Sequence, residues 1–150
     1  MPMALHPPMR LALDLSAGAA KAGEVPVAAV VTFGGRVVAS GVNAMREALD
    51  PTAHAEIVAI RQASRVLGQS RLDGCDLWVT LEPCAMCAGA IALSRIARLF
   101  YGAPDPKGGA VSNGPRLFSQ PTCHHRPEIY SGIGERESAT QLRAFFALRR

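Results

Sequence analysis

The sequence predicts a single α/β domain in which a mixed β-sheet is covered by helices. Its 150 residues match the usual size of one domain, and no linker, repeat or low-complexity tract divides them. Hydrophobic residues make up 49% of the chain and charged residues 19%, a composition that excludes a disordered protein. After an opening hairpin, segments typical of strands alternate with segments typical of helices. We therefore expect residues 1–150 to form one domain.

The first part of the chain is expected to form a helix followed by a β-hairpin. A Pro-Pro pair at 7–8 fits the first turn of a helix, and apolar residues then recur at helical spacing until Gly23. Residues 25–31 (VPVAAVV) are typical of a buried strand. The Gly-Gly pair at 34–35 predicts a tight turn into a second strand over residues 36–40.

The rest of the chain continues with helices and strands in turn, after a loop over residues 43–50. Asp50-Pro51 is typical of a helix start, because aspartate caps helix ends and proline fits the first turn. Residues 102–126 are rich in glycine and proline and are expected to be a loop. The other expected elements are a helix over 52–67, a strand over 76–81, a helix over 84–94 opened by Pro83, a strand over 96–101 and a final helix over 135–150.

No segment of the sequence predicts a membrane span or a secretory signal. The longest uncharged run, Pro83–Ser94, has twelve residues, which is fewer than the about 18 that suggest a span. The N-terminus lacks a basic segment followed by an unbroken apolar one. We therefore expect a cytoplasmic protein, in which closely spaced cysteines bind metal or catalyse more often than they pair.

The basic residues are concentrated in the C-terminal third. Residues 1–94 carry seven basic and eight acidic side chains, whereas residues 95–150 carry nine basic and four acidic ones. Fourteen of the sixteen basic residues are arginine, which suits phosphate contacts. This pattern fits a nucleic-acid partner and fits an ordinary arginine-rich surface equally well.

Three side chains have the chemistry and the spacing of zinc ligands: His54, Cys84 and Cys87. The two cysteines lie three residues apart at an expected helix start, so that both thiols can face one side. His54 lies in the first turn expected for the preceding helix, and two helix starts separated by one strand can meet at one end of a sheet. One imidazole and two thiolates favour zinc over harder metal ions.

This ligand set predicts a catalytic site. Three protein ligands leave one position of a tetrahedral zinc open to a water molecule, whose pKa can fall to about 7. Glu56 is the candidate for moving protons beside that water. Two alternatives are ordinary buried thiols and a structural zinc closed by a fourth ligand. The candidates for a fourth ligand are Cys75, Cys123, His124 and His125. Of these, we expect Cys75 to be a small core residue and the two histidines to lie in a loop.

The pattern His54-Ala55-Glu56 followed by Pro83-Cys84-x-x-Cys87 resembles the signature of the zinc-dependent nucleobase deaminases. The resemblance covers nearly the whole chain from Met9. Over this length the sequence is similar to the family of bacterial tRNA-specific adenosine deaminases, with the likeness most evident over residues 50–56, 79–90 and 105–109.

The resemblance implies a fold and a reaction. The fold would be a cytidine-deaminase-like three-layer α/β/α sandwich with a five-stranded mixed sheet flanked by helices. The reaction would be hydrolytic deamination of adenosine to inosine at the wobble position of a tRNA anticodon, with Glu56 as the proton shuttle. One zinc ion per chain, a tRNA anticodon stem-loop as partner and a homodimer are also implied.

The resemblance further assigns roles to residues around the site. Asn43 would hydrogen-bond the target nucleoside, Val27 and Leu81 would be apolar walls, and the backbone N–H groups of Ala55 and Cys84 would line the same pocket. The candidate RNA-binding residues are Asp105, Lys107, Phe145, Phe146, Arg149 and Arg150.

The phenylalanines and the terminal arginines among these RNA-binding candidates also have a plainer interpretation. Helical spacing also favours a core position for at least one of the two phenylalanines. The two terminal arginines fit a solvated tail of the chain nearly as well as they fit a contact with RNA.

Two other functions are compatible with the zinc pattern. The first is a deaminase of a free nucleobase or nucleoside, of the guanine or cytosine type, with the same zinc and the same Glu56. The second is a nucleic-acid-binding module with a structural zinc, in which Glu56 would be dispensable and a fourth protein ligand would be required.

Overall fold

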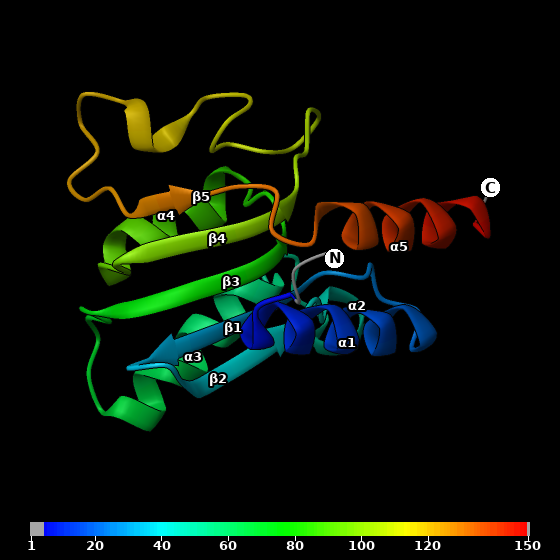
Figure 1. The fold of residues 1–150 in the computed structure, drawn as a ribbon, viewed down its shortest axis with the longest axis horizontal. Coiled ribbons are helices and arrows are strands. Elements are labelled where there is room, and N and C mark those ends of the chain that lie inside the picture. Colours follow the sequence, from blue (N-terminus) through cyan, green and yellow to red (C-terminus); the bar gives the residue numbers. More distant parts are fainter. Residues whose placement is uncertain (1–4, 150) are drawn as a thin grey trace.

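The computed structural model describes residues 5–149 and contains a five-stranded mixed sheet with helices on both faces (Figure 1). The strand order is β2-β1-β3-β4-β5, in which β1 is antiparallel to both neighbours and the other two pairs are parallel. The elements are α1 Pro7–Lys21, β1 Ala28–Phe33, β2 Arg36–Val42, α2 Met45–Ala48, α3 Ala55–Leu67, β3 Cys75–Leu81, α4 Ala85–Ser94, β4 Arg98–Ala103, the 3-10 helix η1 Leu117–Ser119, β5 Glu128–Tyr130 and α5 Glu135–Ala147.

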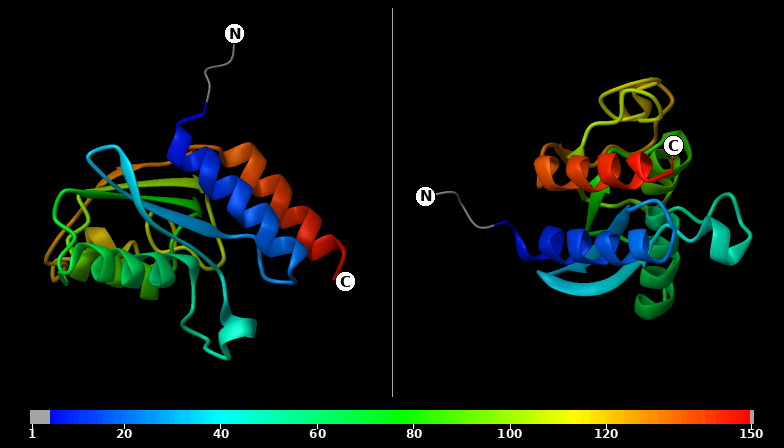
Figure 2. Two further views of the ribbon diagram at one scale, coloured as in Figure 1. Left: turned by 90° about the horizontal axis from the view of Figure 1, so that it is seen from below. Right: turned by 90° about the vertical axis from the view of Figure 1, so that its right-hand side faces the viewer.

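The helices form one layer on each side of the sheet. α1 and α5 lie side by side on one face, and α3 and α4 cover the other (Figure 2). This arrangement is the three-layer sandwich that the resemblance implied. No helix within residues 5–149 has both the length and the apolar character needed to cross a membrane.

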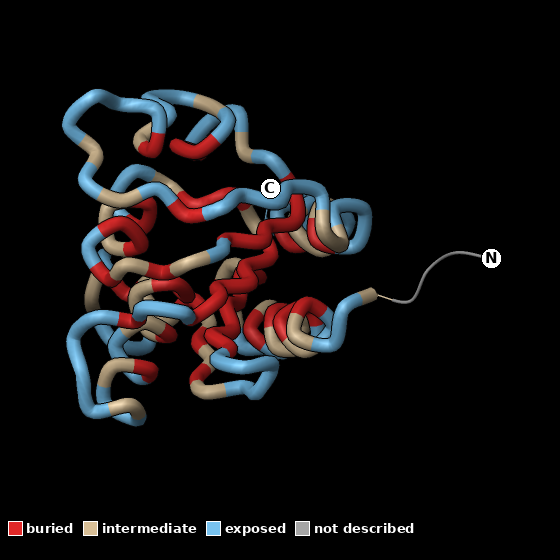
Figure 3. The backbone as a smooth tube through the Cα atoms, turned by 60° about the vertical axis from the view of Figure 1, so that its left-hand side comes forward, coloured by how far each residue is buried: buried red, intermediate tan, exposed pale blue. Residues whose placement is uncertain are grey.

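Because both faces of the sheet are covered, the hydrophobic core has two parts. Side chains alternate along β3, so that Leu77 and Val79 belong to the core beneath α3 and α4 while Trp78 belongs to the core beneath α1. Buried backbone is concentrated in the middle of the sheet (Figure 3). Burial on both faces is typical of an α/β fold and confirms the predicted fold class. The prediction that Cys75 is a buried core residue is also confirmed.

The first strand begins three residues later than predicted, at Ala28. Pro26 has no N–H to donate to a neighbouring strand, and the N–H of Val27 bonds to the carbonyl oxygen of Val25 at 2.8 Å in a local turn. Val25 and Val27 therefore lie just outside the strand, at the edge of the sheet where the candidate site forms. The other strands differ from the predicted bounds by one or two residues.

Two helices also begin later than predicted. α3 starts at Ala55 because Asp50 does not cap it: Asp50 Oδ1 accepts hydrogen bonds from the Thr52 N–H at 2.9 Å and from its hydroxyl at 2.7 Å. Such a local turn competes with helix formation. His54 is consequently the N-cap residue of α3, and Cys84 is the N-cap residue of α4, rather than members of the first turns.

Three short elements were not predicted. α2 lies in the loop expected over residues 43–50, and η1 lies in the loop expected over 102–126. All three residues of β5 are exposed, so the strand has no apolar alternation that could reveal it.

The last helix ends at Ala147, before the predicted end at Arg150, which lies outside the described residues.

Candidate active site

Two helix starts bring the three predicted zinc ligands together at one edge of the sheet. His54 precedes α3 and Cys84 precedes α4, while Cys87 lies in the first turn of α4. The Nδ1 atom of His54 lies 3.5 Å from the sulfur of Cys84 and 3.6 Å from the sulfur of Cys87. All three ligand atoms lie within 4.8 Å of one another.

The geometry of this cluster fits a tetrahedral zinc ion. Zinc bonds of about 2.3 Å to sulfur and about 2.0 Å to nitrogen imply nitrogen–sulfur separations of about 3.5 Å in a tetrahedron. The observed separations of 3.5 and 3.6 Å agree with this requirement. Within residues 5–149 the cluster contains no fourth Cys, His, Asp or Glu. These three residues would therefore hold zinc with one position open, which is the catalytic pattern.

The candidates for a fourth ligand have other contacts or lie elsewhere. Cys75 is buried in the core, and the Cys123 thiol donates to the carbonyl oxygen of His125 at 3.2 Å. The Nε2 atom of His125 lies 2.6 Å from the carbonyl oxygen of Ile96 and donates to it. Among the described residues none of the four candidates, including His124, belongs to the cluster, so the closed four-ligand site is not formed there.

The sulfur of Cys84 is prepared to bind metal. A hydrogen bond from the Cys87 side chain, together with backbone N–H groups of Cys87 and Met86, lowers the pKa of the Cys84 thiol to about 5. A thiol with this pKa is ionised at neutral pH, and the thiolate is the form that binds metals.

Glu56 lies beside the cluster in a nearly closed environment. The residue is 4% exposed and lines the same hollow as His54 and Cys84. Burial raises the pKa of its carboxyl to about 7, and the nearby Cys84 thiolate adds to the effect. A carboxyl group with such a pKa can both take up and release a proton near neutral pH.

The hollow above the cluster has a volume of about 280 Å³ and collects most of the predicted substrate residues. Val27, Asn43 and Leu81 line it, as expected from the sequence, together with Asp105. We call it the first hollow. Its size and its apolar walls suit a flat ring held over the cluster.

Ala55 is the exception among the predicted substrate residues. Ala55 is fully buried, and its backbone N–H donates to Asn43 Oδ1 at 2.9 Å. The expectation that this N–H contacts substrate stays a prediction; in the structure the N–H holds Asn43, which lines the hollow.

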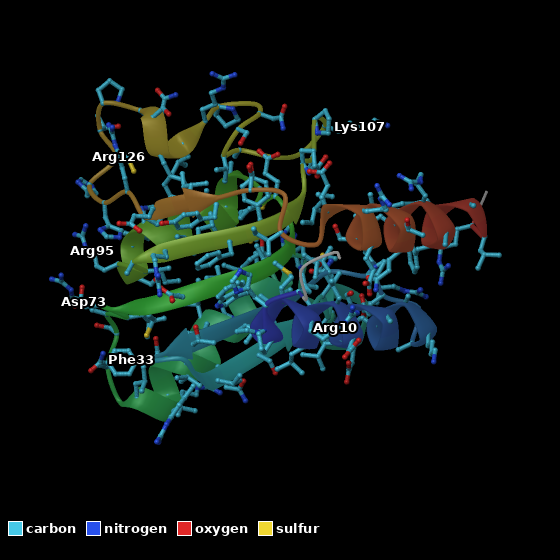
Figure 4. The ribbon with its side chains drawn as sticks, viewed as in Figure 1. Arg10, Phe33, Asp73, Arg95, Lys107 and Arg126 are labelled. Carbon is cyan, nitrogen blue, oxygen red and sulfur yellow. The ribbon has the colours of Figure 1, made fainter. Side chains whose placement is uncertain are left out.

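A second hollow, of about 720 Å³, adjoins the first and contains several predicted RNA-binding residues. Asp105 lines both hollows, whereas Lys107, Phe146 and Arg149 line the second. In Figure 4 Lys107 extends from the loop above the start of α5. The two hollows form a continuous surface because they also share Val25, Leu81 and Gly108.

Phe145 does not belong to this surface. It is 6% exposed and packs edge-on against Phe146, while the Arg149 guanidinium lies 3.5 Å above its ring. This burial agrees with the alternative role of Phe145 in the core, and its contact with RNA stays a prediction. Phe146 is 48% exposed. Arg150, also predicted to bind RNA, lies outside the described residues.

Sequence reasoning did not place four residues that line the first hollow among the site residues: Val25, Met45, Glu82 and Gly108. Met45 lies in the unpredicted helix α2, so no periodic pattern indicated it. Glu82 follows a buried strand and directly precedes Pro83 and the candidate ligand Cys84. This position of an acidic residue was the only signal in the sequence that Glu82 belongs to the site.

Comparisons with known proteins agree with this geometry. Residues 5–103 match the family described as the cytidine and deoxycytidylate deaminase zinc-binding region. The tRNA-specific adenosine deaminase of Agrobacterium fabrum is 58% identical over 142 residues, which cover 95% of this chain and 93% of that protein. The enzyme of the same name from Bacillus subtilis is 41% identical over 92% of this chain and 86% of its own length.

Solved structures show the same fold. A structure from a study of A-to-I editing by tRNA:A34 deaminases matches with a TM-score of 0.89 and 58% identity, covering 90% of this chain and 98% of that one. Guanine deaminase from Bacillus subtilis matches with a TM-score of 0.66 and 33% identity, covering 98% and 94%. The chain therefore belongs to the cytidine and deoxycytidylate deaminase family, in the branch that holds the bacterial tRNA-specific adenosine deaminases.

Proposed function

We propose that this protein converts adenosine to inosine at the wobble position of a tRNA anticodon by hydrolytic deamination. The observation that carries the proposal is the junction of the two hollows. The first is small and holds Glu56 and the His-Cys-Cys cluster, and the second is larger and lined by Lys107, Phe146 and Arg149. A single base fits the first, and neighbouring nucleotides fit the second.

The residues of the first hollow have three different roles in the proposed reaction: they bind the metal, transfer protons and orient the nucleoside. His54, Cys84 and Cys87 would hold zinc, which would make a water molecule a good nucleophile at neutral pH. Glu56 takes one proton from the attacking water as its oxygen adds to C6 of adenine, and passes this proton to the ring nitrogen N1. Glu56 then takes the proton of the new C6 hydroxyl and passes it to the amino group, so that the C6–N bond breaks and ammonia leaves. Asn43 orients the nucleoside: its Oδ1 is held by the Ala55 N–H, it lines the first hollow, and its Nδ2 has no hydrogen-bond partner among residues 5–149.

The second hollow supplies contacts for the nucleotides beside the target. A deaminase must receive its base outside the stack, and an anticodon loop offers such bases. The exposed ring of Phe146 can stack on a base, whereas Lys107 and Arg149 can neutralise phosphates. Asp105 lies where the two hollows meet and can accept a hydrogen bond from a ribose hydroxyl.

We further propose that the protein acts in the cytoplasm as a homodimer with one zinc ion per chain, and that residues 1–150 form one deaminase domain. The outer face of α4 supports the dimer. Leu93 is exposed there, beside the small residues Gly89 and Ala92, over a mainly apolar hollow that Leu117 completes. Small residues allow two helices to approach closely. The single sheet with a core on each face supports one domain.

The deciding experiment offers the purified protein an unmodified anticodon stem-loop with adenosine at the wobble position. Free adenine, guanine and cytosine and their nucleosides are offered separately. We expect inosine in the RNA and no ammonia from the free compounds. Release of ammonia from guanine or cytosine compounds without RNA editing would establish the free-base alternative, to which the similarity with guanine deaminase points.

A further inference from the structure

Glu82 is a buried carboxylate between the metal-binding segment and the loop that carries Asp105 and Lys107. It directly follows β3 and precedes Pro83 and Cys84. The residue is only 2% exposed. Burying a carboxylate is costly unless hydrogen bonds compensate for the lost water. No step of the proposed reaction uses this carboxylate. We therefore infer its role from its hydrogen-bond partners.

Five N–H groups of a single loop surround this carboxylate. Oε1 accepts the backbone N–H of Asp105 at 2.9 Å and the side-chain amide of Asn113 at 2.7 Å. Oε2 accepts three successive backbone N–H groups, those of residues 111–113, at 3.1, 2.9 and 3.0 Å. Successive N–H groups that converge on one point form an anion-binding nest. Both ends of the segment 105–113 are therefore tied to one side chain.

The middle of the loop also packs directly on Glu82. A Cβ atom added to Gly109 would lie 2.5 Å from Glu82 Cδ and 2.6 Å from the carbonyl oxygen of Asp105. The backbone of Gly109 is outside the left-handed region, so glycine is needed here for space and not for its conformational freedom. This close approach is independent of the hydrogen bonds and shows that the loop is folded around the carboxylate.

The anchored loop presents groups to both hollows. Asp105 and Gly108 line both of them, and Lys107 lines the second. Asp105 Oδ1 in turn accepts the backbone N–H groups of Lys107 and Gly108 at 3.1 and 3.0 Å. Glu82 therefore holds Asp105, and Asp105 holds the turn that carries Lys107.

We propose that Glu82 is a positioning residue, which fixes residues 105–113 in the conformation that receives the RNA and so acts on binding rather than on the chemical step. The inference rests on the proposed action on tRNA, because it assigns the loop to RNA binding. It goes beyond the zinc chemistry, in which Glu82 takes no part.

The test compares the wild-type protein with Glu82→Gln and Gly109→Ala. Glutamine keeps the shape of the side chain but turns an amide group toward the N–H donors, whereas alanine pushes the loop away without changing any charge. In the absence of RNA, we expect amide exchange of residues 111–113 to become at least about tenfold faster in both variants, since hydrogen bonds to a charged group are among the stronger ones. We expect Kd for the anticodon stem-loop to rise about tenfold, with the single-turnover rate at saturating RNA within about threefold of wild type.

Asp76→Asn is the matched control. Asp76 is also a nearly buried carboxylate on β3, but it lies at the opposite end of the strand and pairs with Arg98 at 2.6 Å. We expect this variant to lower the melting temperature without changing loop exchange or Kd. That result separates the loss of a buried carboxylate in general from the loss of this one.

Two results would overturn the proposal. One is wild-type exchange and wild-type Kd in Glu82→Gln and in Gly109→Ala. The other is a zinc-loaded Glu82→Gln protein with normal Kd and a strongly reduced rate at saturation, which would give Glu82 a direct part in the chemistry. A wild-type protein that does not bind the RNA would instead overturn the proposed function, and amide exchange would still decide whether Glu82 orders the loop.

Discussion

The side chain of Asn43 caps the helix that carries the candidate catalytic residues: its Oδ1 accepts the backbone N–H of Ala55 at 2.9 Å. The first N–H groups of any helix lack partners within the helix. Here the partner comes from the residue just after β2, and Ala55 lies between His54 and Glu56. This hydrogen bond therefore fixes the backbone between the candidate metal ligand His54 and the candidate proton shuttle Glu56 to the residue that follows β2.

Substitutions at Asn43 should separate this structural role from substrate binding. Asn43→Ala removes the acceptor and leaves a buried N–H unpaired, which should cost about 1–3 kcal/mol of unfolding free energy. Asn43→Asp keeps the acceptor but loses the Nδ2 donor. We expect Asp to restore most of the stability and neither variant to restore kcat/KM, as measured by thermal unfolding and by inosine formation. Wild-type activity in Asn43→Asp would remove the nucleoside contact from the proposal.

Glu56→Gln should keep the metal and lose the reaction. The amide cannot carry a proton, so turnover should fall by about 10²–10⁴-fold, the usual range for a general acid or base. Zinc analysis of the purified variant and single-turnover inosine formation test this directly. Near-normal turnover would contradict the assignment of Glu56 as proton shuttle.

Removal of the metal should abolish activity and lower the melting temperature, since a ligand that binds only the folded state stabilises it. A chelator should have both effects, and added zinc should reverse them whereas magnesium should not. Cys87→Ser should lose zinc. Cys123→Ala, which alters a cysteine outside the cluster, should keep both zinc and activity.

Binding of the anticodon stem-loop should weaken steeply with salt, because contacts with phosphate release counterions. Lys107→Ala should weaken binding and reduce the slope of log K against log salt by about 1. Arg126→Ala is a suitable control because Arg126 lies at the far end of the same long segment (Figure 4) and outside both hollows. Equal effects of the two variants would show that general charge, rather than the second hollow, binds the RNA.

The contact between α1 and α5 should depend on pH. Arg10 pairs with Glu137, and this hydrogen bond keeps the pKa of the Glu137 carboxyl below its ordinary value of 4.5. The stabilisation is complete above pH 4.5 and is lost as the pH falls through the lowered pKa. The pair is partly exposed, so we expect at most about 1 kcal/mol. The difference in melting temperature between wild type and Glu137→Gln should therefore shrink in acid and in high salt; a constant difference would contradict the pairing.

The parts of the fold and the site that the sequence revealed are those with a strong local signal. Apolar runs identified the central strands, and the residue types at 54, 84 and 87 predicted a cluster of candidate metal ligands, which the structure brings together. The short edge strand β5 escaped prediction because all its side chains are exposed. Its place in the sheet depends on pairing with β4, which is a tertiary contact.

The features of the site that the sequence did not reveal have the same physical origin. Asp50-Pro51 is typical of a helix start, but hydrogen bonds from Thr52 to the Asp50 side chain close a turn instead. The hydrogen bond from the backbone N–H of Ala55 to Asn43, twelve residues earlier, is likewise a contact that no local pattern indicates. The role of Glu82 required knowing that residues 105–113 fold back onto it.

The match to the wider deaminase family ends at Ala103, where β4 ends and before the loop and helix that line the second hollow begin. The candidate catalytic residues and much of the surface proposed to bind the RNA thus lie in consecutive stretches of polypeptide, and α5 lies across the sheet from α3 and α4. Glu82 belongs to the first stretch, yet five N–H groups of the second bond to it. A redirection of this fold to a new target would therefore have to rewrite the last third of the gene and still keep a loop that folds around this carboxylate.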